Sequence, residues 1–323
     1  MAQTNRIEKV AIVGASGRLG KHFAEELLKT GKHTVTAVTR TDSKGTLPAG
    51  VKVAQVNYDD DGQSLVSALQ GQQFLIITLS IRAPPDTHSK LVRAAAKAGV
   101  PYIMPNAYGF DILNKSLREE DLYGATSLQH CVEIEKLGIS YVAMVCGFWY
   151  EWSLALGEFW FGLDIKNKKA TFFDDGETRV NVSTWRQCGR ALAALLSLPE
   201  SGASPSVSQW KNMPFYFASF RVSQRDMLDS IHRVTGTTDK DWEITYEPTG
   251  ERYKNGIDEM QKGARTGFAK AMYSRLFFPN GDGDFESSRG LANDLIGLPK
   301  EDLDEATKRT VEMVESGWNP LAQ

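Results

Sequence analysis

The sequence contains few cysteines and no long apolar run. Its 323 residues include only three cysteines, Cys131, Cys146 and Cys188, and their spacing does not suggest a zinc or redox motif. The longest strongly apolar run, Phe74–Ile81, is far shorter than the roughly 20 residues that a membrane span requires. The first residues also lack the apolar stretch of a signal peptide. We therefore expect a cytoplasmic protein in a reducing compartment, with no membrane as partner.

Neither sign of charge is in excess. Lys and Arg number 37 against 40 Asp and Glu, which gives a net charge of −3 and an isoelectric point near 6.0. Such a chain has no global cationic field that would hold a polyanion, so nucleic acid is not an expected partner. A hydrophobic content of 41% and a charged content of 24% are typical of a globular protein.

The first half of the chain alternates short apolar runs with helical patterns. At roughly 100–200 residues per domain, its length fits one large domain or two coupled domains. The alternation predicts right-handed β-α-β crossovers and a parallel sheet. Strands are predicted near residues 10–13, 34–38, 51–56, 74–79, 102–104 and 140–145. One helix is predicted to begin near residue 19, and others are predicted over residues 62–70, 87–98 and 119–137.

After about Gly147 the regular alternation stops and aromatic residues crowd together. Asp174-Asp175-Gly176 indicates a hairpin turn between strands 171–173 and 179–182, and Ser183 is expected to cap a helix that runs to about residue 197. Later helices are predicted at 224–234, 250–263 and 303–316, and strands at 215–219 and 242–246. No flexible linker separates the halves. We therefore expect residues 148–323 to form a smaller lid, interleaved with residues 1–147.

A glycine-rich loop directly follows the first predicted strand and opens a predicted helix. Glycines permit a tight turn and a close backbone approach, and the free N–H groups of a helix start can bind a pyrophosphate. The same pattern also occurs in simple flexible turns, but both flanking elements are present here, which favours dinucleotide binding. Its GxxGxxG spacing is typical of the short-chain dehydrogenase superfamily. The candidate residues are Gly14, Ser16, Gly17, Arg18, Leu19 and Gly20.

The end of the second strand indicates which dinucleotide binds. An acidic residue about 20 positions after the glycines receives the ribose 2′-hydroxyl of NAD, whereas an arginine accommodates the 2′-phosphate of NADP. Here Thr39 and Arg40 stand at that point, and Ser43 and Lys44 offer further donors. NADP(H) is the expected cofactor. The alternative is that Arg40 is a solvated charge and that Asp42 binds the ribose.

Four stretches together resemble the NmrA-like and isoflavone-reductase-like group of atypical short-chain dehydrogenases, and in particular its fungal members. They are Gly14–Gly20, Tyr102–Gly109, Cys146–Glu151 and Leu298–Leu303. The resemblance implies an α/β fold: a Rossmann-type doubly wound parallel sheet over residues 1–147 that binds NADP, and a smaller C-terminal α+β substrate domain. It also implies that Asn57 and Tyr58 lie near the adenine. The residues that it places beside the nicotinamide are Thr78, Leu79, Ser80, Pro105 and Asn106.

The catalytic acid of such enzymes is harder to find. Classical superfamily members use a Tyr four residues before a Lys, but no tyrosine in this sequence has a Lys at that distance. The resemblance implies instead a lysine on the helix before the sixth strand, and that position falls on Ser127. Tyr123 lies four residues earlier, and His130 follows on the same helix with an ordinary pKa near neutrality. Tyr123 and Ser127 are therefore the catalytic candidates, with Tyr123 as a packed helix residue as the alternative.

The aromatic run after the sixth predicted strand has two interpretations. It lies at the carboxyl edge where open α/β sheets bind ligands, so it can line a pocket for a flat substrate or form the core of the second part. The candidate substrate residues are Tyr108, Phe148, Trp149, Tyr150 and Trp152. No metal is proposed, because the five histidines are far apart in the sequence and the Asn280–Asp284 segment lacks two calcium-loop positions. We interpret that segment as a surface turn.

These observations predict an NADPH-dependent oxidoreductase. Its substrate would be a small, largely apolar or aromatic secondary metabolite that accepts hydride at a C=C, C=O or C=N bond. The alternative is a non-catalytic NADP(H)-binding redox sensor of the NmrA type, which the missing lysine favours. The sequence leaves the oligomeric state open.

Overall fold

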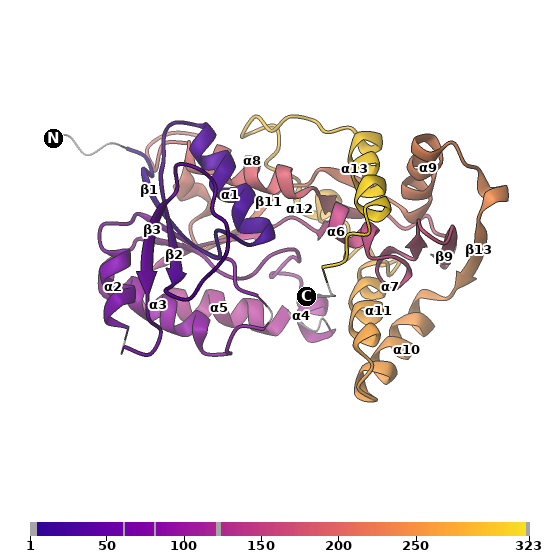
Figure 1. Cartoon of the computed structure of the whole chain (residues 1–323), viewed down its shortest axis with the longest axis horizontal. Coiled ribbons are helices and arrows are strands. Elements are labelled where there is room, and N and C mark those ends of the chain that lie inside the picture. Colours follow the sequence, from indigo (N-terminus) through magenta and orange to yellow (C-terminus); the bar gives the residue numbers. More distant parts are fainter. Residues whose placement is uncertain (1–4, 61, 81, 121–123, 321–323) are drawn as a thin grey trace.

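The computed structural model describes residues 5–60, 62–80, 82–120 and 124–320. Its largest element is a seven-stranded sheet in the order β11-β6-β5-β4-β1-β2-β3, in which neighbouring strands are parallel. Helices lie on both sides of this sheet (Figure 1), which confirms the predicted Rossmann-type α/β fold. The strands are β1 (Lys9–Val13), β2 (Thr34–Arg40), β3 (Lys52–Val56), β4 (Phe74–Ile77), β5 (Tyr102–Met104), β6 (Ser140–Val145) and β11 (Met213–Tyr216).

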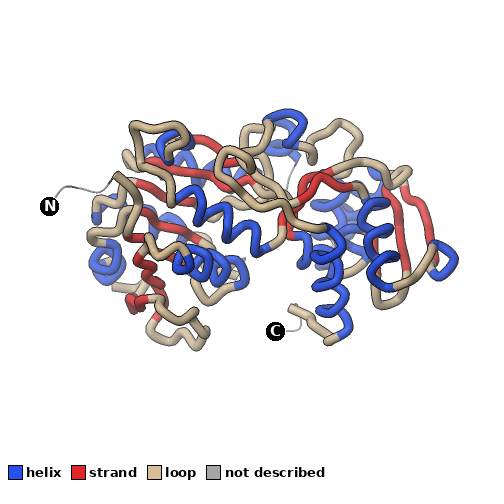
Figure 2. Tube along the Cα trace, turned by 90° about the horizontal axis from the view of Figure 1, so that it is seen from above, coloured by secondary structure: helices blue, strands red, loops and turns tan. Residues whose placement is uncertain are grey.

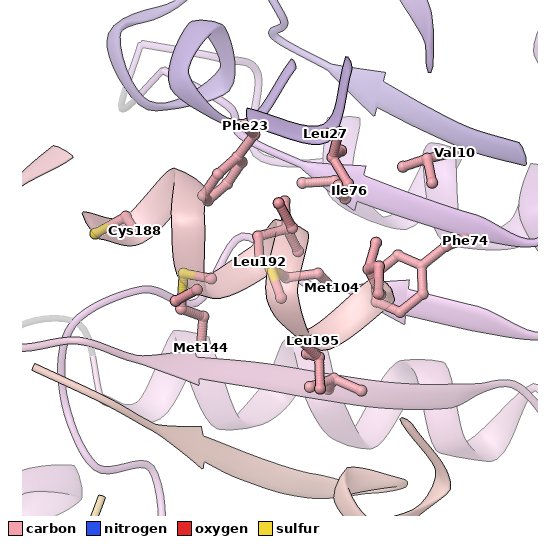
Figure 3. Packing of buried hydrophobic residues seen from close by; sticks show 14 of the residues in the cluster. Val10, Phe23, Leu27, Phe74, Ile76, Met104, Met144, Cys188, Leu192 and Leu195 are labelled. Carbon is pink, nitrogen blue, oxygen red and sulfur yellow. The ribbon is translucent and has the colours of Figure 1, made fainter. Parts of the chain in front are cut away.

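Each face of the sheet has its own apolar core. Successive side chains of a strand point to opposite faces, so Val10 and Ile12 join one core and Ala11 and Val13 the other. The first core packs under α1 (Arg18–Lys29) and α8 (Trp185–Leu196). Figure 3 shows Phe23 and Leu27 of α1 in one cluster with Leu192 and Leu195 of α8 and with sheet residues such as Val10 and Ile76. The second core packs under α2 (Gln63–Leu69), α3 (Thr87–Ala98) and α5 (Gly124–Lys136).

The second part of the chain contributes to the large sheet and also builds a smaller unit. Strand β11 pairs with β6, and α8 packs on α1, so both belong to the sheet region. The smaller unit lies at the opposite end of the molecule from the N-terminus (Figure 2) and has two three-stranded sheets. One contains β7 (Phe148–Trp149), β10 (Val180–Ser183) and β12 (Phe220–Val222), and the other β8 (Leu163–Asp164), β9 (Lys169–Phe173) and β13 (Glu243–Glu247).

An aromatic core holds the smaller unit together. Phe148 stacks on Tyr273 with ring centroids 3.8 Å apart, and Phe161 meets both rings edge-on. None of the helices in the described ranges is long and apolar enough to span a membrane. The remaining helices are α4 (Lys115–Glu120), α6 (Tyr150–Ala155), α7 (Glu158–Phe161), α9 (Gln224–Thr235), α10 (Thr249–Gln261), α11 (Arg265–Leu276), α12 (Phe285–Arg289) and α13 (Leu303–Glu315).

The predicted hairpin at Asp174-Asp175-Gly176 is wrong. The flanking strands β9 and β10 lie in different sheets, and β9 pairs with β8 and β13 instead. Asp174 has a φ of 53°, and its carboxylate accepts hydrogen bonds from the backbone N–H and the hydroxyl of Thr249. The turn is therefore tied to the start of α10 rather than used to fold one strand back on the next.

Two further local predictions also need correction. The N-cap of α8 is Thr184, whose hydroxyl oxygen accepts from the Gln187 N–H at 3.0 Å, whereas Ser183 belongs to β10 and donates to the Cys146 carbonyl. The helix predicted over 119–137 corresponds to two helices, α4 and α5. A Cβ on Gly124 would lie 2.9 Å from the Cα of Arg118, so α5 begins beside α4 and does not continue it.

The Asn280–Asp284 segment is a surface turn only at Asn280 and Gly281, which are exposed, whereas Asp282 to Asp284 are partly or fully buried. The Asp282 carboxylate pairs with Arg275 at 2.6 Å and accepts hydrogen bonds from the side chains of Asn114 and Ser116. Its side chain is only 13% exposed. The segment therefore ties the end of α11 to the start of α4, and a buried ion pair replaces the solvated loop that the sequence indicated.

The contact between α1 and α8 predicts the effect of a substitution at Gly189. A Cβ there would lie 2.6 Å from the carbonyl oxygen of His22, so Gly189→Ala forces the two helices apart. We expect a net loss of about 1–3 kcal/mol in the free energy of unfolding, measured by urea denaturation. Gly250→Ala in α10 is the matched control, because its Cβ would meet nothing within 4 Å and the change is expected to be neutral or stabilising. Equal effects would contradict the packing argument.

Candidate functional site

The glycine-rich loop lies at the carboxyl edge of the sheet, between β1 and α1. Gly14 has a φ of 81°, and its carbonyl accepts from the Gly17 N–H at 2.8 Å. A Cβ on Gly14 would collide with the Thr78 carbonyl, and one on Gly20 would collide with Gly14. Only glycine fits these two positions. Leu19 is buried in the core below, and the first N–H groups of α1 are left at the sheet edge.

The ends of β4 and β5 meet this loop. The Thr78 hydroxyl donates to the Val13 carbonyl at 2.7 Å, and the Leu79 N–H donates to the side-chain oxygen of Asn106 at 2.9 Å. Pro105 is buried beside Asn106, and Ser80 is exposed. The structure thus brings together, at one edge, the residues that the sequence predicted for the nicotinamide end of the cofactor.

The end of β2 carries an exposed ion pair. The Arg40 guanidinium lies 3.2 Å from the Asp42 carboxylate, and both side chains are more than two-thirds exposed. The loop that follows packs against the glycine-rich loop, since a Cβ on Gly45 would overlap the Ser16 hydroxyl. The loop that begins after Arg40 and the loop that contains Ser16 are therefore neighbours. Arg40 and Asp42, the residues of the two interpretations of cofactor choice, are paired with each other.

The remaining cofactor candidates surround this end of β2. Thr39 is partly buried, and Lys44 is exposed on the loop after it. Burial raises the pKa of the Tyr58 hydroxyl, and the nearby charge of Arg40 acts in the opposite direction. Asn57 is exposed, and its backbone N–H donates to the Ser64 hydroxyl at 2.8 Å. Tyr58 therefore lies close to Arg40 at the carboxyl end of β3.

Two of the aromatic candidates belong to the core of the smaller unit. Phe148 is buried against Tyr273, as described above. Tyr150 is fully buried, and its hydroxyl hydrogen bonds with that of Thr307 at 2.7 Å. A substrate would reach these rings only if the core opened, so their role in substrate binding stays a prediction that this packing does not support.

Trp152 is placed differently, because it contacts the glycine-rich loop. The Arg18 guanidinium carbon lies 4.6 Å from the centroid of Trp152 and 5.8 Å from that of Trp318. The two tryptophans meet edge to face, and Trp149 nearby in sequence is partly buried. Sequence reasoning missed Trp318, which comes close only because α13 returns the chain to this point. The arginine at the start of α1 thus joins the two halves of the protein.

Tyr108 lies beneath the site. Its hydroxyl donates to the Ile77 carbonyl at 2.9 Å, and its ring packs against Phe23 of α1. Burial raises the pKa of this hydroxyl well above its usual value. With its only hydroxyl proton used in this bond, Tyr108 supports the end of β4, and its predicted contact with substrate is not tested.

The catalytic candidates lie on and before α5. Tyr123 falls outside the described residues, and Ser127 is partly buried on α5. Burial lowers the pKa of His130, and Asn106 and Glu133 act in the opposite direction. Its ring stacks on that of His88 with centroids 3.6 Å apart. This pair joins α3 and α5 behind the β5 end and was not found from the sequence.

A buried carboxyl stands next to Trp152. Glu151 is 5% exposed, and burial raises its pKa to about 7. Its partners are the Arg309 guanidinium at 3.5 Å and the Trp185 N–H at 3.3 Å. One cation and one N–H offset only part of the cost of burying this charge, so the neutral form is favoured up to about neutral pH.

The raised pKa of Glu151 makes stability depend on pH. Between the ordinary pKa of 4.5 and about 7 the folded state keeps a proton that the unfolded state releases, so stability falls as pH rises through this window. Glu151→Gln stays neutral at all pH values. Relative to the wild type it is expected to gain about 3 kcal/mol in the free energy of unfolding between pH 4 and pH 8, because any pH-independent cost of the substitution cancels in this difference. Urea midpoints at the two pH values test this, and an unchanged difference would contradict it.

The comparisons with known proteins agree with this geometry. The model of the NmrA-like family matches residues 6–154. The oxidoreductase aprR of Aspergillus flavus is 27% identical over 92% of this chain and 96% of its own length. Among solved structures, an isoflavone reductase superposes with a TM-score of 0.74 at 18% identity, over 95% of this chain and 99% of that one.

A second solved structure is that of the NADPH-dependent quinone oxidoreductase QOR2 of Escherichia coli in complex with NADPH. It has a TM-score of 0.68 at 21% identity and covers 94% of this chain and 99% of its own. These likenesses show the fold. Together with the family match they confirm the resemblance to NmrA-like and isoflavone-reductase-like proteins that the sequence indicated.

Proposed function

Because residues 6–154 match the model of the NmrA-like family, we propose that the protein is an NADP(H)-dependent reductase. Its substrate is a small, largely apolar or aromatic metabolite with a reducible C=C, C=O or C=N bond. One observation carries the proposal: Gly14, Thr78 and Asn106 lie together at one edge of the sheet, at the start of α1. The oxidoreductase name of the A. flavus relative and the NADPH complex of the E. coli relative support it.

The residues present fit this cofactor. The Gly17 position is open to a close backbone approach, and the 12-residue helix α1 presents its free N–H groups to a pyrophosphate. Arg40 and Lys44 would hold the 2′-phosphate, and Tyr58 and Asn57 would hold the adenine. Thr78–Ser80 and Asn106 would hold the nicotinamide. When bound, the cofactor supplies the hydride, and these residues orient it and limit the access of water.

Arg40 is expected to decide cofactor choice. A charge-assisted contact with the 2′-phosphate is worth about 1.5–3 kcal/mol, so Arg40→Ala weakens NADPH binding by roughly one to two decades and leaves NADH binding nearly unchanged. Calorimetric titration with both cofactors measures the difference. Arg93→Ala is the matched control, because Arg93 of α3 is similarly exposed at 66% and pairs with Glu133 of α5. Equal losses for NADPH and NADH would remove Arg40 from the 2′-phosphate site.

The proton in the reduction has three possible sources. With Ser127 at the position that aligns with the family lysine, the remaining candidates are the Tyr123 phenol and water or the substrate itself. The His88 imidazole is neutral at physiological pH, because burial lowers its pKa to about 3, and it does not serve as an acid. Hydride positioning is therefore the larger part of what the described residues contribute.

A serine at position 127, where the family resemblance implies a lysine, also favours the second candidate function. A protein that binds NADP(H) but holds no proton donor reports the redox state of the cofactor without turnover. The same fold then acts as a sensor of the NmrA type, and its output would be a change in shape or partner. Binding of NADPH is common to both functions, so only turnover separates them.

Turnover with a substrate panel tests the reductase function. Purified protein is expected to oxidise NADPH with at least one member of a panel of enones, quinones, aromatic ketones and imines. Tyr123→Phe then identifies the donor: a fall in kcat of about 10²–10⁴ assigns the proton to the phenol, and a fall below about threefold assigns it to water or substrate. Tyr246→Phe on the exposed surface of β13 is the control. Tight NADPH binding with no oxidation across the panel would establish the sensor instead.

A further inference from the structure

The stacked histidines His88 and His130 lie directly behind the Asn106 turn. Their ring centroids are 3.6 Å apart with an interplanar angle of 12°, and His88 is 3% exposed. The Asn106 N–H donates to Nε2 of His88 at 3.4 Å, and the Asn106 backbone also faces the His130 ring. The two histidines come from α3 and α5 and are 42 positions apart in the sequence. Their rings together contact the backbone of a residue at the candidate nicotinamide site.

This arrangement requires the His88 imidazole to be neutral. Nε2 of His88 accepts a hydrogen bond, so its proton is on Nδ1. Among the described residues, the buried Nδ1 atom of neither histidine has a hydrogen-bond partner, which costs folding free energy. Two apolar side chains would fill the same space without this cost. Burial and the neighbouring His130 lower the pKa of His88 to about 3, so the acceptor is retained throughout the physiological range.

The side-chain amide of Asn106 has one of its two polar atoms in a hydrogen bond. The Asn106 Oδ1 atom accepts from the Leu79 N–H at 2.9 Å, which fixes the orientation of the carboxamide. Its Nδ2 atom donates to none of the described residues. The backbone N–H and the Oδ1 atom of Asn106 are thus held by neighbouring elements. Its Nδ2 atom is a free donor beside the ends of β4 and β5.

We propose that His88 and His130 are positioning residues that hold Asn106 so that its free amide donates to the carboxamide oxygen of the nicotinamide. The inference rests on the proposed NADP(H) function and deepens it, because it states how the reactive ring is oriented at this edge. A pre-oriented donor limits rotation of the ring about its glycosidic bond, and an unoriented one does not. The histidines themselves do not touch the cofactor.

The test compares two ligands that differ only at the nicotinamide end. Binding of NADP⁺ and of 2′-phospho-ADP-ribose, which lacks the nicotinamide ring, is measured by calorimetry on the wild type and on His88→Leu. We expect the variant to bind NADP⁺ about three- to tenfold more weakly, and 2′-phospho-ADP-ribose within twofold of the wild type. His88→Gln, whose side-chain oxygen can accept from the Asn106 N–H, is expected to recover at least half of the NADP⁺ affinity on a logarithmic scale.

Each outcome has a defined meaning. Equal weakening of both ligands, or unchanged NADP⁺ binding, overturns the inference, because the histidines would then act on the whole fold or not on the ring. If His88→Leu does not fold, His130→Phe keeps a flat ring against His88 without a nitrogen near Asn106, and the same difference between ligands is expected. A wild type that binds neither ligand refutes the proposed function itself, and this result is distinguishable from the others.

Discussion

Gly14 lies so close to the Thr78 carbonyl that no side chain fits between them. This approach joins the end of β1 to the end of β4, and Gly20 packs on Gly14 in the same way from the first turn of α1. Since the helix start is held against two strand ends, its free N–H groups have a fixed position relative to Asn106. The spacing of the candidate site follows from these backbone contacts rather than from any charged residue.

The smaller unit depends on a different kind of contact. Its aromatic rings pack edge to face and stacked around Phe148 and Tyr273, and they are largely removed from water. One of its links to the sheet region is Arg18, whose guanidinium lies over Trp152 and Trp318. A second link is backbone packing, because a Cβ on Gly147 would collide with the carbonyl of Asn181 in β10. The two halves are therefore joined both by a side-chain contact and by a backbone approach as close as that at Gly14.

The sequence was sufficient for the first six strands of the sheet and its glycine-rich loop because both depend on local patterns, but it did not place β11 in the sheet. Strands such as Val10–Val13 are continuous apolar runs, and each helix between them has its own period. The hairpin at Asp174 failed because Thr249, 75 positions later, binds that carboxylate. His88, His130 and Trp318 are isolated residues in the sequence, and only the fold brings them to the site. How the chain divides into domains, and the role of each site residue, stay predictions.

The place of β11 at the edge of the large sheet has a consequence for biosynthesis. This strand pairs with β6 only after Tyr216 has left the ribosome, and α8 covers α1 only after Leu196 has done so. Until then the nascent sheet exposes the unpaired edge of β6 and the apolar face around Phe23. Both surfaces favour association with other chains. The first part of this protein is therefore expected to need chaperone protection during translation, although its sequence pattern alone suggests a self-sufficient unit.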